Sequence, residues 1–206
     1  MAADALWDGR QASGLESQVL AEVAEEVAAN QAELQFNVEF ITALLDRTDR
    51  FLRSRSAVLA TLPEDSVQPM LEGLSRPQTF DPQTSAASLL SQTALLSADG
   101  IGVRARVSEF FARVSDADEE KEWFNQTSRD LQDHLATYAA RAAEDGRGTV
   151  NEMAARLGAS VLGELRMDEQ LVRLVIQRGA AGEIYLRNLA TLTALLESLS
   201  AQLGEK

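Results

Sequence analysis

Residues 15–62 read LESQVLAEVAEEVAANQAELQFNVEFITALLDRTDRFLRSRSAVLATL, and these 48 residues contain neither proline nor glycine. Their core candidates recur at alternating spacings of three and four residues, which is the periodicity of one face of an α-helix. These candidates are Val23, Val27, Asn30, Leu34, Asn37, Ile41, Leu44, Thr48, Phe51, Val58 and Leu62. Since an α-helix rises about 1.5 Å per residue, this stretch would extend about 70 Å. The sequence therefore predicts a long first helix, within residues 1–62, in an elongated molecule.

Asn30 and Asn37 lie one heptad apart in this stripe and leave two interpretations open. At buried positions they would specify how the helix pairs with a neighbour, because a buried Asn fixes register or oligomeric state. In the second interpretation both asparagines are boundary residues, and the buried stripe comprises Leu20, Val27, Leu34, Val38, Ile41 and Leu45. The second interpretation is the one that we favour from the sequence.

The composition describes an acidic chain that can bury a substantial core. Of 206 residues, 45% are hydrophobic and only 5% aromatic, which suits helices held together by aliphatic side chains. The net charge of −13 repels nucleic acid and anionic membrane surfaces. The chain has no cysteine, so it has no disulfide, thiolate nucleophile or cysteine-ligated zinc. No window of about 18 residues is apolar enough to span a bilayer.

Prolines and glycines divide the chain into helical segments. All four prolines lie between Pro63 and Pro82, so residues 63–102 are expected to hold turns and short helices. In this region Asp81 is the predicted N-cap of a short helix, and the glycines of residues 98–102 are predicted to end it. The later segments are a long helix over 103–145, a short helix over 149–165 and a long helix over 167–203.

These segments predict an all-α fold. We expect an elongated antiparallel bundle of three long helices and about three short ones, forming a single domain over residues 1–206. Aliphatic stripes on long helices are typical of structural and interaction modules rather than of catalytic clefts.

Three segments of the chain carry a family resemblance. Residues 5–11 read ALWDGRQ, Phe80-Asp81-Pro82 leads through a Leu-rich stretch to Val103-Arg104, and residues 171–203 form a final Leu-rich run. Together they resemble a widespread group of uncharacterised bacterial proteins that carry one N-terminal transmembrane helix followed by a helical extracytoplasmic domain. The membrane helix is not in this sequence, which we interpret as a missing upstream segment.

The resemblance implies a location and a role for Trp7. The full-length protein would be anchored in the bacterial inner membrane, with this domain facing the periplasm or the cell exterior. Trp7 would then lie at the lipid interface, where indole rings are enriched, although packing on a neighbouring helix is an equal alternative. Asp4 and Asp8 flank it, and this shortage of basic residues favours the extracytoplasmic side.

Candidate chemical groups are sparse. His134 is the only histidine, with Asp130 and Asp133 near it and Tyr138 one turn further on, a set that can bind a metal or shuttle protons. We interpret it as a solvated helix surface. A run of acidic residues lacks the spacing of a calcium-binding loop, and we interpret it as a solvent-exposed helix face. The run contains Asp116, Asp118, Glu119, Glu120 and Glu122. We predict no catalytic residue, metal or cofactor.

Two further motifs are assigned to helix packing. A basic cluster is expected to pair with Asp46, Asp49 and the acids of an adjacent helix; it comprises Arg47, Arg50, Arg53 and Arg55. Gly179 and Gly182 lack the sequence context of a phosphate loop, so their spacing predicts a close helix contact or a kink.

The sequence thus favours a non-enzymatic, membrane-anchored helical module whose partner is another protein or a second copy of the chain. The alternative is an extracytoplasmic sensor-type bundle that binds a small ligand near the proline-rich region. Its pocket would be lined by Arg76, Phe80, Phe110 and Phe111.

Overall fold

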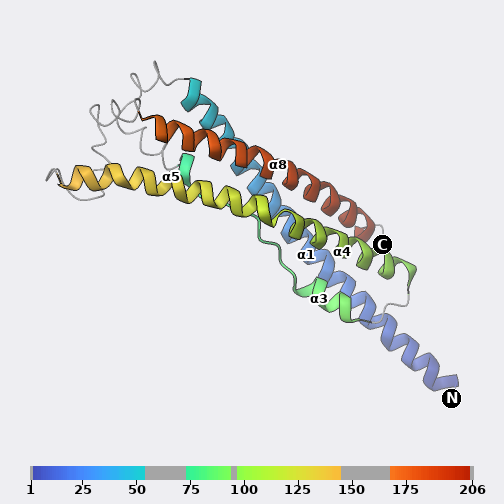
Figure 1. Cartoon of the computed structure of the whole chain (residues 1–206). Coiled ribbons are helices and arrows are strands. Elements are labelled where there is room, and N and C mark those ends of the chain that lie inside the picture. Colours follow the sequence, from blue (N-terminus) through green and yellow to red (C-terminus); the bar gives the residue numbers. More distant parts are fainter. Residues whose placement is uncertain (1, 54–72, 94–96, 145–167, 205–206) are drawn as a thin grey trace. The chain divides into compact units, whose positions relative to one another are not determined.

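The protein is an all-α helical bundle, as the sequence predicts (Figure 1). The computed structural model describes residues 2–53, 73–93, 97–144 and 168–204, and it describes side chains for 13–53, 73–93, 97–138 and 168–204. Within these ranges it contains helices and no strand. The helices are α1 (Ala2–Arg53), α3 (Ser85–Gln92), α4 (Ala98–Asp116), α5 (Asp118–Glu144) and α8 (Glu169–Gly204).

The chain contains two compact units. Unit 1 comprises Met1–Val38, Phe80–Asp118 and Arg187–Lys206, and unit 2 comprises Glu39–Thr79 and Glu119–Leu186. Helices α1 and α8 contribute residues to both units. The units are therefore built from shared helices and not from separate halves of the sequence.

The stripe on α1 is buried at every described position. From Val23 to Phe51 each predicted residue is buried, including Asn30 and Asn37, so the preference for a boundary role was wrong. Asn30 is held by a backbone partner, since its Nδ2 donates to the Gln83 carbonyl and its Oδ1 accepts from the Gln83 N–H. The other asparagine, Asn37, donates from Nδ2 to the Glu33 carbonyl of its own helix. The buried stripe of α1 is thus a heptad pattern that includes polar side chains.

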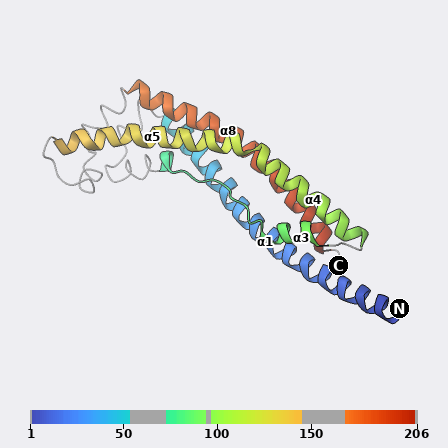
Figure 2. The same cartoon turned by 60° about the horizontal axis from the view of Figure 1, so that its bottom comes forward.

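In each unit α8 packs antiparallel to a neighbouring long helix. In unit 2, Thr48 and Leu45 of α1 face Gly179 and Gly182 of α8 in reverse order. In unit 1, α4 runs against α8, because Gly102 meets Gln202 while Arg106 donates to Ser198 four residues earlier, at 2.6 Å. Figure 2 shows α3 beside α1 in the same unit.

Helix α3 has a different N-cap from the one that the sequence predicts. Its N-cap is Thr84 and not Asp81, and Thr84 makes no side-chain cap hydrogen bond. The first turn is capped instead by Glu26 of α1, whose carboxylate accepts from Ser85 Oγ, Ala86 N and Ala87 N at 2.7 to 3.2 Å. A remote carboxylate thus replaces the local cap, which a local sequence motif does not reveal.

Residues 98–102 begin helix α4 and do not end the preceding helix, so that prediction was wrong. Ser97 is the N-cap, and its Oγ accepts from Gly100 N at 2.9 Å while donating to Glu16. A Cβ at Gly100 would lie 2.2 Å from Glu16 Oε1. The glycine is therefore required for the close approach of Glu16 and not for a break in the helix.

The predicted helix over 103–145 is divided at Ala117, between α4 and α5. Ala117 keeps helical torsions, with φ −86° and ψ −3°, and its N–H is shared between the Arg113 and Val114 carbonyls. The helix is tightened at this one residue, and the sequence there contains no proline or glycine. The hydrophobic periodicity therefore continues through Ala117 and gives no sign of the interruption.

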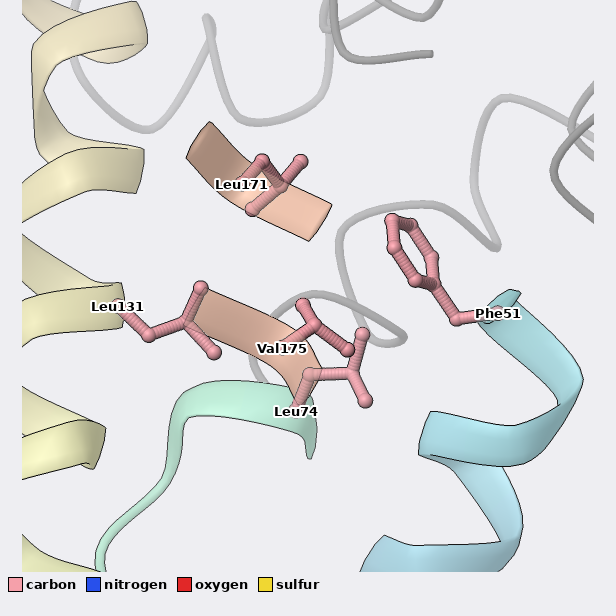
Figure 3. Close-up of a cluster of buried hydrophobic side chains, with 5 residues drawn as sticks. All are labelled: Phe51, Leu74, Leu131, Leu171 and Val175. Carbon is pink, nitrogen blue, oxygen red and sulfur yellow. The ribbon is translucent and has the colours of Figure 1, made fainter. Parts of the chain in front are cut away.

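The core of unit 2 contains a cluster of five buried side chains from four segments (Figure 3). Figure 3 shows Phe51, Leu74, Leu131, Leu171 and Val175 converging on a common interior. Burying one such side chain stabilises the fold by about 1.5–3 kcal/mol. Leu74 joins the segment before Pro77 to the three long helices of this unit.

Two sets of predictions lie beyond the described residues. They concern the end of the first helix at residues 54–62 and the short helix over 149–165. Within the described part of the chain, no helix combines the length and apolarity needed to cross a membrane.

Candidate functional site

A surface pocket lies in unit 2 between the C-terminal part of α1 and the first half of α8. It has a volume of about 310 Å³. Its lining residues are Leu45, Asp46, Thr48, Asp49, Leu52, Ile176, Gly179, Ala180 and Glu183. We call it the α1–α8 pocket. Most of these side chains are exposed or half-buried, so the pocket opens to solvent.

Small residues on α8 bring the two helices together at the floor of the pocket. A Cβ at Gly179 would lie 3.0 Å from Thr48 Cγ2, and a Cβ at Gly182 would lie 3.4 Å from Leu45 Cδ2. These distances confirm the predicted close helix contact. Helix α8 continues without interruption from Glu169 to Gly204.

The pocket combines an apolar wall with acidic side chains from both helices. Ile176 keeps 50% of its surface exposed and lines the pocket with Leu45 and Leu52, which are half-buried. Asp49 pairs with Arg53 at 2.6 Å, as the sequence predicts for the basic cluster. Among the residues that the structure describes, the carboxylates of Asp46 and Glu183 form no ion pair.

Among the described residues of unit 2, Arg178 is the largest fully buried side chain, with 1% of its surface exposed. Its Nε donates to Ser128 Oγ at 2.9 Å, its Nη2 donates to the Arg76 carbonyl at 2.6 Å, and its guanidinium lies 4.8 Å from the centre of the Phe124 ring. Within the described residues Nη1 has no hydrogen-bond partner. Burial lowers the pKa of Arg178 to about 9, so the side chain remains charged at neutral pH.

Arg178 is not among the candidate residues of the sequence, although its spacing carries a signal. Leu171, Val175, Arg178 and Gly182 follow the same alternation of four and three residues as the buried stripe of α8. A charged residue at such a position predicts a buried cation with internal partners. Here those partners are a hydroxyl, a carbonyl and an aromatic ring.

His134 belongs to a partly buried group and not to a solvated surface, so our interpretation of it was wrong. Its Nε2 lies 2.6 Å from Asp168 Oδ2, which also accepts from the Tyr138 hydroxyl. Asp168 caps α8 as well, because its Oδ1 accepts from Leu171 N at 2.9 Å. The two acids expected near His134 are both exposed, and Asp130 accepts from Gln126 instead.

The pKa of Asp168 is lowered to about 2. Burial raises this pKa, and the hydrogen bonds from Tyr138, from the Leu171 N–H and from His134 together lower it by more. The carboxylate is therefore ionised throughout the neutral range, where it fixes His134 and Tyr138 in place. The signal in the sequence is an Asp three residues before the Leu-rich run, the pattern of an N-cap.

The predicted ligand pocket near the proline-rich region is only partly brought together. The Phe80 and Phe110 rings pack edge to face with centroids 6.4 Å apart, and the centroids of Phe110 and Phe111 are 5.1 Å apart, all within unit 1. Arg76 belongs to unit 2, where its carbonyl accepts from Arg178. None of the four lines the α1–α8 pocket. The side chain of Trp7 lies outside the described residues.

Groups that bind metals are scattered in the described ranges. No three His, Asp or Glu side chains there come together as a metal site. The α1–α8 pocket therefore presents carboxylates beside apolar surface without a preformed metal centre in that part of the chain.

No protein-family model, curated protein or solved structure matches the chain. The class defined by the fold is an all-α helical bundle. The resemblance to membrane-anchored bacterial proteins stays a prediction.

Proposed function

We propose that the chain is a non-catalytic helical module that binds another protein at the α1–α8 pocket. One observation carries this proposal. The pocket places the half-exposed Ile176 beside the carboxylates of Asp46 and Glu183, which form no ion pair within the described ranges. A surface that combines an apolar contact with charged groups at its edge has the composition of a protein interface, in which apolar contacts give affinity and charges give specificity.

Two buried or partly buried polar groups in the described part of unit 2 have internal partners. Asp168 holds His134 and Tyr138, while Arg178 is enclosed by Ser128 and Phe124. None of these residues lines the pocket. Their internal contacts account for the charged and titratable groups most deeply placed in the described part of this unit, and this supports a binding role in preference to catalysis.

Anchoring in a membrane is the second part of the proposal, and it is supported by the resemblance of residues 5–11 to a membrane junction. In this arrangement α1 would continue from an upstream membrane helix and carry the pocket outside the bilayer. Expression from the natural gene tests this part. We expect the full-length product in the membrane fraction after an alkaline wash, and recovery in the soluble fraction would contradict it.

The protein-binding part is tested by affinity capture with the whole chain and two matched variants. Ile176→Asp places a charge in the pocket, and Ile101→Asp makes the same change at a 58% exposed position on α4 of unit 1. We expect the native chain and Ile101→Asp to recover the same protein, and Ile176→Asp to lose it. Equal recovery by all three, or no specific recovery, would contradict the proposal. The recovered protein is compared with the chain itself, because a second copy is one candidate partner.

A small-ligand sensor is the second candidate, favoured by the volume of the pocket. About 310 Å³ lies at the lower end of the range for small-molecule sites. A thermal-shift screen discriminates the two functions, since a ligand at 100 times its Kd adds about 2.7 kcal/mol of stability. A stabilising compound whose effect is lost in Ile176→Asp would support the sensor.

A further inference from the structure

We propose that the α1–α8 pocket receives an arginine side chain from a basic segment of the partner protein. The inference rests on the proposed protein-binding function and names the chemistry that the pocket recognises. It follows from three properties of the pocket: its apolar wall, the origin of its carboxylates on two helices, and two carboxylates that form no ion pair among the described residues.

The apolar wall matches the aliphatic part of an arginine. Leu45 and Leu52 of α1 and Ile176 of α8 line the pocket, and all three retain exposed surface. Arginine buries its methylene stem along such a surface while its guanidinium remains at the polar edge. A small inorganic cation would leave this apolar surface in contact with water.

The carboxylates come from both helices. Asp46 lies on α1 and Glu183 on α8, so a cation in the pocket has acceptors on opposite walls. A guanidinium presents five N–H donors in a planar fork and can serve two carboxylates at once, whereas an ammonium is a compact point charge. Acceptors on two walls therefore favour arginine over lysine.

The two carboxylates can bind a cation without loss of an internal ion pair. Asp49 already pairs with Arg53, but Asp46 and Glu183 have no ion pair among the described residues. Both side chains are exposed, so a cation can reach them from solvent. The net charge of −13 also attracts a basic segment over a long range and raises its association rate.

Binding of defined peptides to the whole chain tests the inference. The probe is a fluorescent amphipathic peptide with arginines on one face, and two analogues carry citrulline or lysine at those positions. Citrulline keeps the shape of arginine without its charge. By fluorescence anisotropy at low salt, we expect the arginine peptide to bind at least about tenfold more tightly than either analogue.

Matched variants locate the binding. Asp46→Asn with Glu183→Gln removes the two pocket carboxylates, and Glu25→Gln with Asp133→Asn removes two exposed acids elsewhere with the same change in net charge. We expect the pocket pair to weaken binding of the arginine peptide about tenfold and the control pair to have little effect. Circular dichroism checks that both double variants are folded, as expected when all four side chains are exposed.

Each contrary outcome has a distinct meaning. Equal weakening by both double variants would show attraction by net charge alone and would overturn the inference. Equal binding of the citrulline or lysine peptide, or equal competition by spermidine, would overturn the assignment to arginine. If no arginine peptide binds while Ile176→Asp still loses the captured protein, the inference fails and the proposed function stands.

Discussion

Arg178 places a charge in the interior of unit 2 with incomplete hydrogen bonding. Two of its nitrogens have acceptors and its guanidinium lies over Phe124, but Nη1 has no acceptor in the described part of the chain. Taking an ion out of water costs several kcal/mol, and the partners of Arg178 offset only part of that cost. Arg178 contributes to the fold by joining three segments, because it lies on α8, Ser128 lies on α5, and Arg76 lies in the segment before α3.

Two substitutions of Arg178 distinguish the cost of its buried charge from the benefit of its hydrogen-bond geometry. We expect Arg178→Lys to lower the free energy of unfolding by about 2–3 kcal/mol, because the ammonium keeps a buried charge without the fork that reaches both acceptors. Arg178→Met should cost less, since it removes the charge and retains most of the volume. Urea denaturation measures both variants. A lysine variant as stable as the methionine variant would contradict this account.

The lowered pKa of Asp168 makes the free energy of unfolding depend on pH. Its pKa is about 2 in the folded protein against an ordinary value of 3.8, so its contribution is complete above about pH 5 and is lost as the pH falls from about 4 to 2. The shift corresponds to about 2 kcal/mol at neutral pH. We expect Asp168→Asn to be less stable than the native chain by about this amount at pH 6, and the difference to shrink towards pH 2.

Denaturation between pH 2 and 7 measures this difference. Asp133→Asn on the exposed side of α5 is the control and should leave the stability difference flat. A constant gap between Asp168→Asn and the native chain over the whole range would show that Asp168 acts through packing and not through its ionisation.

At the scale of the elements, α1 supplies polar caps to the helices that pack on it. Glu26 serves the first turn of α3, Glu16 contacts Ser97 at the start of α4, and Asn30 holds the backbone of Gln83 just before α3. An unpaired N–H group in a buried helix end costs about 1–3 kcal/mol. One helix therefore determines where two others begin.

Removal of the Glu26 charge tests this dependence. Glu26→Gln keeps the size of the side chain but replaces one acceptor oxygen with a donor that faces Ser85, Ala86 and Ala87. We expect a loss of about 1–3 kcal/mol and faster hydrogen exchange at the Ala86 and Ala87 amides. Glu25→Gln, at an exposed neighbouring position, should change neither.

Replacement by alanine is expected to have opposite effects on stability at two glycines, Gly14 and Gly100. Gly14 lies inside α1, and a Cβ added there would meet no heavy atom within 4 Å among the described residues, so Gly14→Ala should stabilise the protein by about 0.5–1 kcal/mol. Gly100→Ala would displace the Glu16 carboxylate from Ser97 and should destabilise it by about 1 kcal/mol. Thermal denaturation of the two variants checks both signs, and a stabilising Gly100→Ala would contradict the role of Glu16.

The sequence predicts helices correctly where the signal comes from residues that are close together in the chain. The heptad of α1 and the Leu-rich run of α8 give the long helices because periodicity is a local property. The errors at Asp81 and at residues 98–102 have a common cause. The groups that settle these helix starts, Glu26 and Glu16, are separated from them by 60 and 81 residues in the sequence.

At the scale of the whole molecule, the candidate site was beyond sequence reasoning for a similar reason. Its walls come from residues 45–52 and 176–183, and only packing of α1 on α8 brings them together. The spacing of Gly179 and Gly182 indicates a helix contact but not which helix is met. His134 stands out in the sequence as the only histidine, yet its partner Asp168 is 34 residues away and lies on no shared helical face.

The sharing of α1 and α8 between the two units predicts that the molecule unfolds in one cooperative step. Melting one unit removes the packing from part of both helices, and a helix without its packing is marginal in water. Trp7→Phe leaves Trp123, which is in unit 2, as the only tryptophan, so its fluorescence reports that unit while circular dichroism reports all helices. We expect the two urea transitions to coincide. We also expect Glu26→Gln, a change in unit 1, to shift the Trp123 midpoint. An unchanged Trp123 midpoint with a split dichroism curve would show that the units unfold independently, and would make each unit a separate folding domain despite its shared helices.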